Sequence, residues 1–159
     1  MNLSLSPLQI KTALRVAKPA PVVFEAIVEP AQMANYFIAY GSHRMEEGKT
    51  VQWSFPEMEG AFPIQVKKVV PGQEIVFTWN DVDGSETTVT ILLQPVSETV
   101  TFVTITEGEK AATEDGIRWL KSNTEGWANF LACLKAFLEY GINLRKGAFD
   151  PSQMPVQEA

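Results

Sequence analysis

The pattern that constrains this chain most is a long amphipathic stretch near its C-terminus, residues 115–140. Apolar residues recur there at four-three spacing in two adjacent stripes, while Lys121 and Glu125 fall on the opposite side. A helix of about 26 residues is about 39 Å long, and so broad an apolar face is typical of a helix buried against a concave sheet. Gly141 follows the last periodic residue and suits the left-handed position that ends many helices.

The rest of the chain before this stretch is dominated by segments with the pattern of β-strands. These segments are 8–17, 50–55, 61–70, 74–80, 87–94 and 99–107. Turn signals separate several of them, notably Pro71-Gly72 and Asp83-Gly84. Consecutive strands joined by short turns favour an antiparallel sheet.

Two prolines mark short helices between the first and second of these segments. Pro21 suits the first turn of a helix, where its missing N–H costs nothing, and the apolar spacing predicts a helix over 21–28. Pro30 starts a second predicted helix over 30–37, where apolar residues lie four apart.

This order of elements predicts an α+β fold of the helix-grip type. A curved antiparallel sheet of six to seven strands wraps around a long C-terminal helix, and two short helices follow the first strand. The 159 residues fit a single domain, 1–159, with a core over about 8–144. Residues 147–159 contain Pro151 and Pro155 and few apolar residues, so we expect this tail to be loosely ordered.

A straight helix rarely fills a curved sheet completely, so we expect a cavity between the two. The side chains predicted to face it are mostly aromatic or aliphatic, with two polar residues among them. These candidate ligand-binding residues are Trp53, Phe55, Phe62, Ile64, Phe77, Trp79, Val89, Ile91, Phe102, Thr104, Trp119, Asn123, Trp127, Phe130 and Leu131. Plain core packing explains the same stripes, and both interpretations are open at this point.

The opposite face of the predicted sheet carries Val76, Leu92, Val103 and Ile105. Exposed apolar side chains there would indicate a surface for a protein partner or for a second copy of the chain.

Charge and composition exclude several classes of partner. The formal net charge is −6, which disfavours nucleic acid and anionic membrane surfaces, since both require a basic face. We find no apolar run long enough to span a bilayer, so we expect no membrane insertion. Residues 1–7 lack the basic start and apolar run of a signal peptide, and Cys133 is the single cysteine, so we expect a cytoplasmic protein.

The residues give little sign of catalytic chemistry. His43 is the one histidine and is expected at the surface, and no Cys or His pair has the spacing of metal ligands. Cys133 is expected to be a small buried residue. Glu107 and Asp115 lie around the start of the predicted long helix, where Asp115 suits a capping role. We therefore predict no catalytic residues, no metal and no cofactor.

Two short motifs resemble a known family. Residues 22–27 with Pro30 and the pair Tyr36-Phe37 resemble the opening of the START-like, or SRPBCC, superfamily, in the branch similar to the C-terminal domain of the activator of Hsp90 ATPase. Glu125-Gly126-Trp127, followed by a ladder of leucines, resembles the last helix of that family. The resemblance covers roughly residues 8–144.

The resemblance implies a helix-grip fold with a cavity between sheet and helix. Relatives bind lipids, polyketides, hormones or other apolar molecules, a few are cyclases or aromatases, and some are partners of a chaperone. Our first hypothesis is non-enzymatic binding of a small apolar or amphipathic molecule. The alternatives are a protein–protein module, chaperone-associated or dimerising through its sheet, and an enzyme of the cyclase type.

Overall fold

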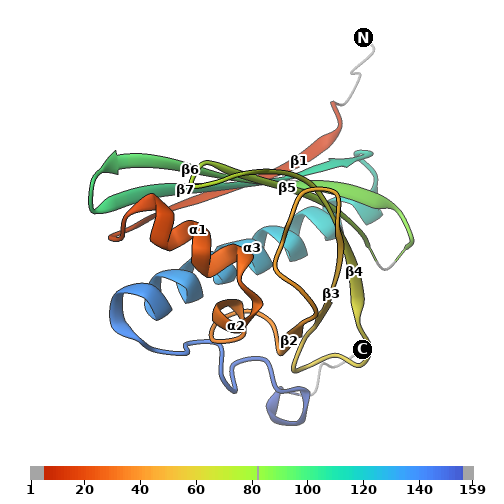
Figure 1. The fold of residues 1–159 in the computed structure, drawn as a ribbon. Coiled ribbons are helices and arrows are strands. Elements are labelled where there is room, and N and C mark those ends of the chain that lie inside the picture. The colour runs from red at the N-terminus through yellow and green to blue at the C-terminus, as the bar shows by residue number, and fades with distance from the viewer. Residues whose placement is uncertain (1–5, 82, 156–159) are drawn as a thin grey trace.

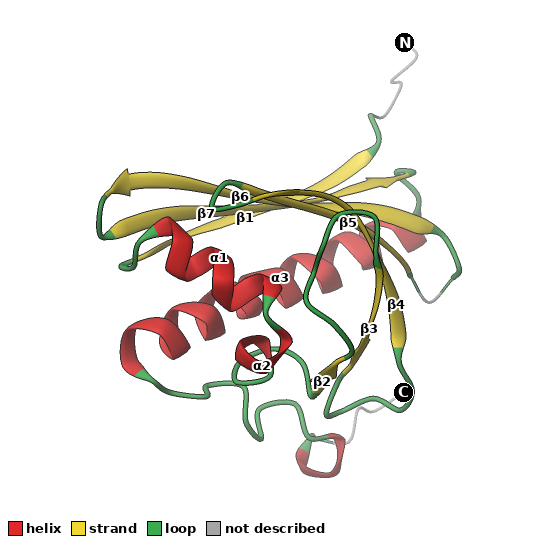
Figure 2. Ribbon diagram, viewed as in Figure 1, coloured by secondary structure: helices red, strands yellow, loops and turns green. Residues whose placement is uncertain are grey.

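The computed structural model describes residues 6–81 and 83–155, which form the predicted combination of one sheet and a long C-terminal helix. Residues 1–5, and residues 156–159 of the predicted tail, lie outside the described residues. The elements are β1 (Leu8–Val16), α1 (Ala20–Val28), α2 (Pro30–Met33), β2 (Tyr40–Gly41), β3 (Thr50–Ser54), β4 (Phe62–Val70), β5 (Glu74–Asn80), β6 (Glu86–Ser97), β7 (Val100–Lys110), α3 (Glu114–Tyr140) and a short 3-10 helix (Pro151–Gln153). Figure 2 shows the strands in one curved layer with the helices on its concave side, so the predicted helix-grip fold is confirmed.

The strands of the described residues form one seven-stranded antiparallel sheet in the order β1-β7-β6-β5-β4-β3-β2. Each strand from β2 to β6 pairs with the next, and β1 pairs with the other edge of β7. In β4 the pairing register shifts between Val66 and Lys68, and such a bulge bends a strand. The sheet curves over α3, as Figure 1 shows, so one helix covers a concave surface.

The core lies on the concave face because alternate residues of each strand point to the same side of a sheet. Ile75, Ile91 and Ile105 are register partners across β5, β6 and β7, and all three are fully buried. Trp53 packs edge-on against Phe77 at a centroid distance of 5.4 Å and extends this core toward the other edge of the sheet.

The orientation of β7 is opposite to the prediction. Val103 and Ile105, expected on the outer face, are fully buried in the core. Phe102 and Thr104, expected toward the cavity, alternate with them and therefore lie on the outer face. Side chains alternate with a period of two, so an error of one residue reverses the whole strand. Glu107 lies on the same inner face as Val103 and Ile105. A charged residue is not expected there, because inner faces are usually apolar.

A hydrogen bond from Tyr36, in the turns after α2, compensates for a proline that follows α1. Pro30 has no N–H to donate to the carbonyl of Ala26, four residues earlier. The buried Tyr36 hydroxyl donates to that carbonyl instead, at 2.9 Å. Helix α2 ends at Met33, so the predicted helix over 30–37 is four residues too long. The chain continues through turns, in which the Tyr36 N–H donates to the Met33 carbonyl at 3.2 Å, three residues earlier rather than four.

Helix α3 agrees with its prediction to within one residue at the N-terminus and carries a cap at each end. The Thr113 side chain accepts a hydrogen bond from the Gly116 N–H at 3.1 Å, and Gly141 has the left-handed φ of 66° that ends the helix. In the last turn, Glu139 accepts hydrogen bonds from the Ala17 N–H, at 3.0 Å, and from Lys135. This carboxylate ties the end of the helix to the end of β1.

Candidate ligand-binding cavity

A cavity of about 630 Å³ opens between α3 and the strands β4 and β5. Its wall is completed by the chain between β3 and β4 and by the segment that follows α3. The lining residues are Phe37, Phe55, Glu57, Met58, Phe62, Pro63, Trp79, Asn80, Asp81, Glu107, Ser122, Asn123, Glu125, Gly126, Trp127, Asn129, Arg145 and Phe149. The volume lies in the range of small-molecule sites.

Aromatic rings make up much of this wall. Trp79 and Trp127 lie 5.5 Å apart, centroid to centroid, with their planes 34° from each other. Phe55 contacts both Phe37, at 5.2 Å, and Phe62, at 5.8 Å. These rings come from four separate parts of the chain, and their mutual contacts hold the wall in place without a ligand.

A buried carboxylate organises the polar part of the wall. Glu107 is 1% exposed. Its Oε2 accepts from Trp79 Nε1 at 2.8 Å and from Thr87 Oγ1 at 2.6 Å, and its Oε1 accepts from Trp127 Nε1 at 2.8 Å and from Asn123 Nδ2 at 3.1 Å. A buried carboxylate needs such partners, and these donors link β5, β6 and α3 through one side chain of β7.

The arrangement around Glu107 is that of an ionised carboxylate. The two indole N–H groups and the Asn123 amide N–H can only donate, so three of the four bonds require an acceptor on Glu107, and both oxygens of an ionised carboxylate are acceptors. The two tryptophans that line the cavity are thus oriented by hydrogen bonds as well as by packing.

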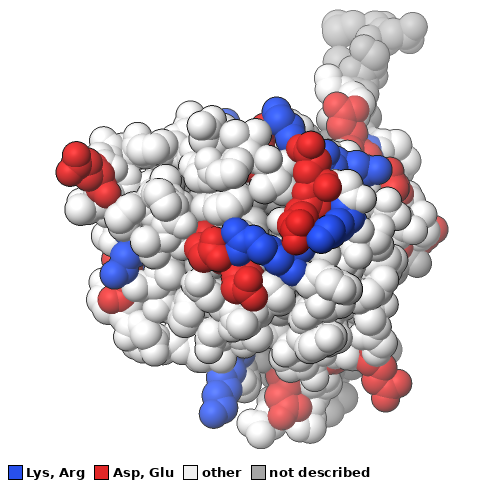
Figure 3. Space-filling view, in the orientation of Figure 1, with Lys and Arg blue, Asp and Glu red and all other residues white. Residues whose placement is uncertain are grey.

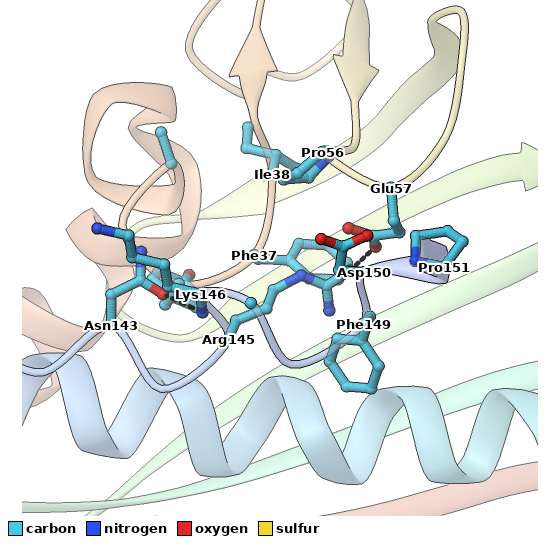
Figure 4. A pocket seen from close by; sticks show the side chains of 13 residues that line it. Phe37, Ile38, Pro56, Glu57, Asn143, Arg145, Lys146, Phe149, Asp150 and Pro151 are labelled. Carbon is cyan, nitrogen blue, oxygen red and sulfur yellow. Dashed lines mark hydrogen bonds and ion pairs between the residues drawn. The ribbon is translucent and has the colours of Figure 1, made fainter. Parts of the chain in front are cut away.

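Arg145 lines both the larger cavity and a smaller one of about 360 Å³. It forms an ion pair with Glu57, and its guanidinium lies 5.6 Å from the ring centroid of Phe37 and 4.9 Å from that of Phe149. Figure 4 shows the Arg145 side chain extended toward Glu57 with Phe149 close by. The segment after α3 is held against the β3–β4 connection through this one side chain.

The structure brings together part of the predicted site. Phe55, Phe62, Trp79, Asn123 and Trp127 line the larger cavity, and their ligand-binding role stays a prediction. The remaining inward-facing candidates are packed in the core: Trp53, Ile64, Phe77, Val89, Ile91, Phe130 and Leu131. Trp119 is also buried but lies under Lys110, whose Nζ is 5.5 Å from its ring centroid.

Sequence reasoning missed the residues that give the cavity its polarity and its closure. Glu107 was predicted near the start of the long helix, not in the wall, although it continues the alternation of Val103 and Ile105. Arg145 and Phe149 follow the helix in a segment without a regular period, so no pattern in the sequence indicates that they turn back over the cavity.

Other titratable groups lie away from this site. His43 is exposed and hydrogen-bonded to Ser42 at 2.9 Å. Cys133 is buried, and burial raises the pKa of its thiol. Within residues 6–81 and 83–155 no three His, Cys, Asp or Glu side chains gather in a way that could hold a metal ion.

The surface carries both signs of charge. On the face seen in Figure 3, acidic and basic side chains are interspersed, and Arg44 pairs with Glu25 and Glu29. Across the described part of the chain, no helix has the length and apolar character needed to cross a membrane.

Solved structures share this fold. The protein SSP2350 from Staphylococcus saprophyticus is 33% identical, with a TM-score of 0.76, over 87% of this chain and 96% of its own. DynU16, a protein from the dynemicin biosynthetic locus, is 25% identical with a TM-score of 0.74 over 84% of this chain, which spans only 48% of DynU16. The Aha1 dimer from Colwellia psychrerythraea is 20% identical with a TM-score of 0.73, over 84% of this chain and 98% of its own.

A search of the curated proteins gives no match. Residues 17–139 match the family described as Activator of Hsp90 ATPase homolog 1-like protein, which is most of the chain. With the match to the staphylococcal protein over nearly all of both chains, this assigns the family: the chain belongs to the activator of Hsp90 ATPase homolog 1-like proteins of the START-like superfamily.

Proposed function

We propose that this protein binds a small, mostly apolar molecule in the larger cavity, between the sheet and α3. The observation that carries the proposal is a 630 Å³ space whose aromatic wall is held by its own contacts and by the Glu107 hydrogen bonds. Sites for small molecules typically combine such an apolar wall with a few polar groups that fix orientation.

The energetics allow useful affinity. A ligand that buries about 300 Å² of apolar surface gains roughly 7 kcal/mol at about 25 cal/mol per Å², before the costs of association. Because the wall is already formed, little further ordering is needed, and binding at micromolar concentrations is reasonable.

Gly126 offers a direct test, because it lines the cavity and a Cβ built there meets no atom within 4 Å. Gly126→Leu therefore adds an isobutyl group at the cavity wall, and its Cβ enters open space. It also removes a glycine from the interior of α3, which stabilises a helix by about 0.5–1 kcal/mol. Ala128→Leu is the matched control, because Ala128 is exposed on the same helix and does not line the cavity.

The assay is a calorimetric titration with 1-naphthalenemethanol, a neutral aromatic probe. We expect binding by the wild type and by Ala128→Leu, and at least about tenfold weaker binding by Gly126→Leu with no loss of thermal stability. Equal affinity for all three proteins would contradict the proposal, and so would a wild type that binds neither this probe nor its ammonium analogue.

The cyclase-like alternative receives less support from this site. A catalytic acid or base needs an oxygen or nitrogen free to exchange a proton with the substrate. Glu107 is the buried carboxylate of the cavity, and its two oxygens are already occupied by donors from the described residues. The geometry favours a wall that orients a ligand over one that transforms it.

Two of the four residues predicted to form a partner-binding face on the sheet are buried in the core, which weakens the alternative of a protein partner. Val103 and Ile105 are core residues, while Val76 and Leu92 remain on the outer face and are half-buried within the chain. A dimer is checked by light scattering on a size-exclusion column, and Leu92→Lys should convert any dimer formed through this face to a monomer.

A further inference from the structure

The charges around the larger cavity are unbalanced. Its described lining residues include four carboxylates, Glu57, Asp81, Glu107 and Glu125, and one guanidinium, that of Arg145. Two of the carboxylates have cationic partners, since Glu57 pairs with Arg145 and Asp81 pairs with Lys110. No cation of the described residues pairs with Glu107 or with Glu125.

Arg145 is the one cation among the described lining residues, and its pairing with Glu57 offsets its charge, while its Nε is buried without a hydrogen-bond partner among the described residues. It is paired with Glu57 and lies between the rings of Phe37 and Phe149. Its side chain and that of Glu57 are 16% and 20% exposed. A ligand carboxylate would compete with Glu57 for this guanidinium, and breaking a mostly buried ion pair is unfavourable.

Glu107 places an uncompensated negative charge directly behind the aromatic wall. Its partners are neutral donors, and it is 1% exposed, so solvent screens its charge poorly. Trp79 and Trp127 both donate their N–H to it, and a negative charge at the ring edge makes the faces of these indoles more electron-rich. Electron-rich indole faces attract cations.

We propose that the cavity is selective for a cationic ligand, an aromatic or aliphatic body that carries an ammonium group, over its anionic or neutral counterparts. The inference rests on the proposed binding function and specifies its ligand class. The ammonium group lies against Trp79 and Trp127, in the field of Glu107, and the apolar body contacts the phenylalanine rings. Glu125, exposed on α3 at the cavity wall, adds attraction for a positive charge.

Three probes with one body separate charge from shape: 1-naphthylmethylammonium, neutral 1-naphthalenemethanol and 1-naphthylacetate. Each is titrated calorimetrically into the wild type at pH 7 and low ionic strength. We expect the ammonium probe to bind about tenfold more tightly than the neutral one, and the carboxylate to bind most weakly. The preference should shrink when salt is raised, though not vanish, because a buried charge is screened less than an exposed one.

Variants show whether the preference comes from the cavity or from the net charge of −6. Glu107→Gln should remove most of the preference for the ammonium probe, and Glu125→Gln should reduce it by a few fold with no effect on folding. Glu98→Gln changes the net charge equally at an exposed turn residue and should leave the preference unchanged.

The outcomes distinguish failure of the charge preference from failure of the binding function. If the neutral probe binds but the ammonium probe binds no more tightly, the inference about charge fails and the binding function stands. If the preference survives both Glu107→Gln and Glu125→Gln, or is lost equally in Glu98→Gln, the cavity carboxylates are not its source and the inference fails. If no probe binds, both proposals fail together.

Discussion

Glu107→Gln tests the account of the cavity wall most sharply, because Gln has the shape of Glu but a different set of hydrogen-bonding atoms. The amide offers one acceptor oxygen and one donor nitrogen where the carboxylate offers two acceptors. If the amide oxygen takes the place of Oε1, the bonds from Trp127 and Asn123 remain. The amide nitrogen then faces Trp79 Nε1 and Thr87, which donate to Oε2 in the native protein.

The magnitude follows from these contacts. Thr87 can reverse its hydroxyl and accept, but the Trp79 N–H cannot, and leaving it without an acceptor costs about 1–3 kcal/mol. Trp79 is half-buried, which puts its cost toward the lower end of that range. The bonds from Trp127 and Asn123 also weaken, because bonds to a charged acceptor are roughly twice as strong as neutral ones. We expect Glu107→Gln to lower the free energy of unfolding by about 3 kcal/mol.

Urea denaturation at pH 7, followed by far-UV circular dichroism, measures this difference without relying on tryptophan fluorescence, which the substitution itself alters. Glu98→Gln is the control and should stay within about 0.5 kcal/mol of the wild type. A Glu107→Gln protein that unfolds within 0.5 kcal/mol of the wild type, at an unchanged slope with urea, would refute the reasoning.

Three further predictions concern how the elements are fastened together. Tyr36→Phe removes the hydroxyl that donates to the Ala26 carbonyl, which has no main-chain donor at position 30 because proline lacks an N–H. The substitution should lower the free energy of unfolding by about 1–2 kcal/mol in thermal or urea melts, and an unchanged stability would show that the carbonyl has another partner. Burial alone raises the pKa of Glu139, but hydrogen bonds from a main-chain N–H and from a lysine outweigh it and lower that pKa below the ordinary 4.5. The charged form of Glu139 therefore stabilises the fold above about pH 4.5, and this contribution is lost as the pH falls through the lowered folded-state value, so wild type and Glu139→Gln should differ in stability at pH 7 and converge in acid; a constant difference from pH 7 to pH 3 contradicts this. Glu57→Gln weakens the ion pair to Arg145 and should raise hydrogen exchange of residues 143–150 several-fold in mass spectrometry while β6 and β7 stay protected; unchanged exchange of 143–150 would show that the pair does not hold this segment.

The sequence predicts most of this fold because the strands and α3 carry clear periods. The alternation in β3, β5 and β6 and the two stripes of α3 depend only on local spacing, and their segments agree closely with the structure. The signal fails where local spacing is ambiguous. In β7 both registers contain apolar residues, and the single large Phe102 suggests the wrong face, while the buried Glu107 makes the correct face look less apolar.

The candidate site is harder to predict because it forms where regular structure stops. Trp79 and Trp127 are found from strand and helix periods, but Phe37, Arg145 and Phe149 lie in turns and in the segment after α3. Their positions depend on long-range pairing, such as that of Arg145 with Glu57, which leaves no periodic trace in the sequence. A cavity is also the volume left between packed side chains, and residue order alone does not determine that volume.

The central claim is that the space between the sheet and α3 holds a small molecule. The most direct test is native mass spectrometry of the wild type and of Gly126→Leu, both purified from the protein's own host and then incubated with small-molecule extract from the same cells. We predict that the wild type carries an adduct that is lost under denaturing conditions, and that Gly126→Leu, with its cavity narrowed by the new side chain, carries much less of it. An equal amount of the adduct on both proteins would place the ligand elsewhere, and two bare proteins after incubation would contradict the binding function itself.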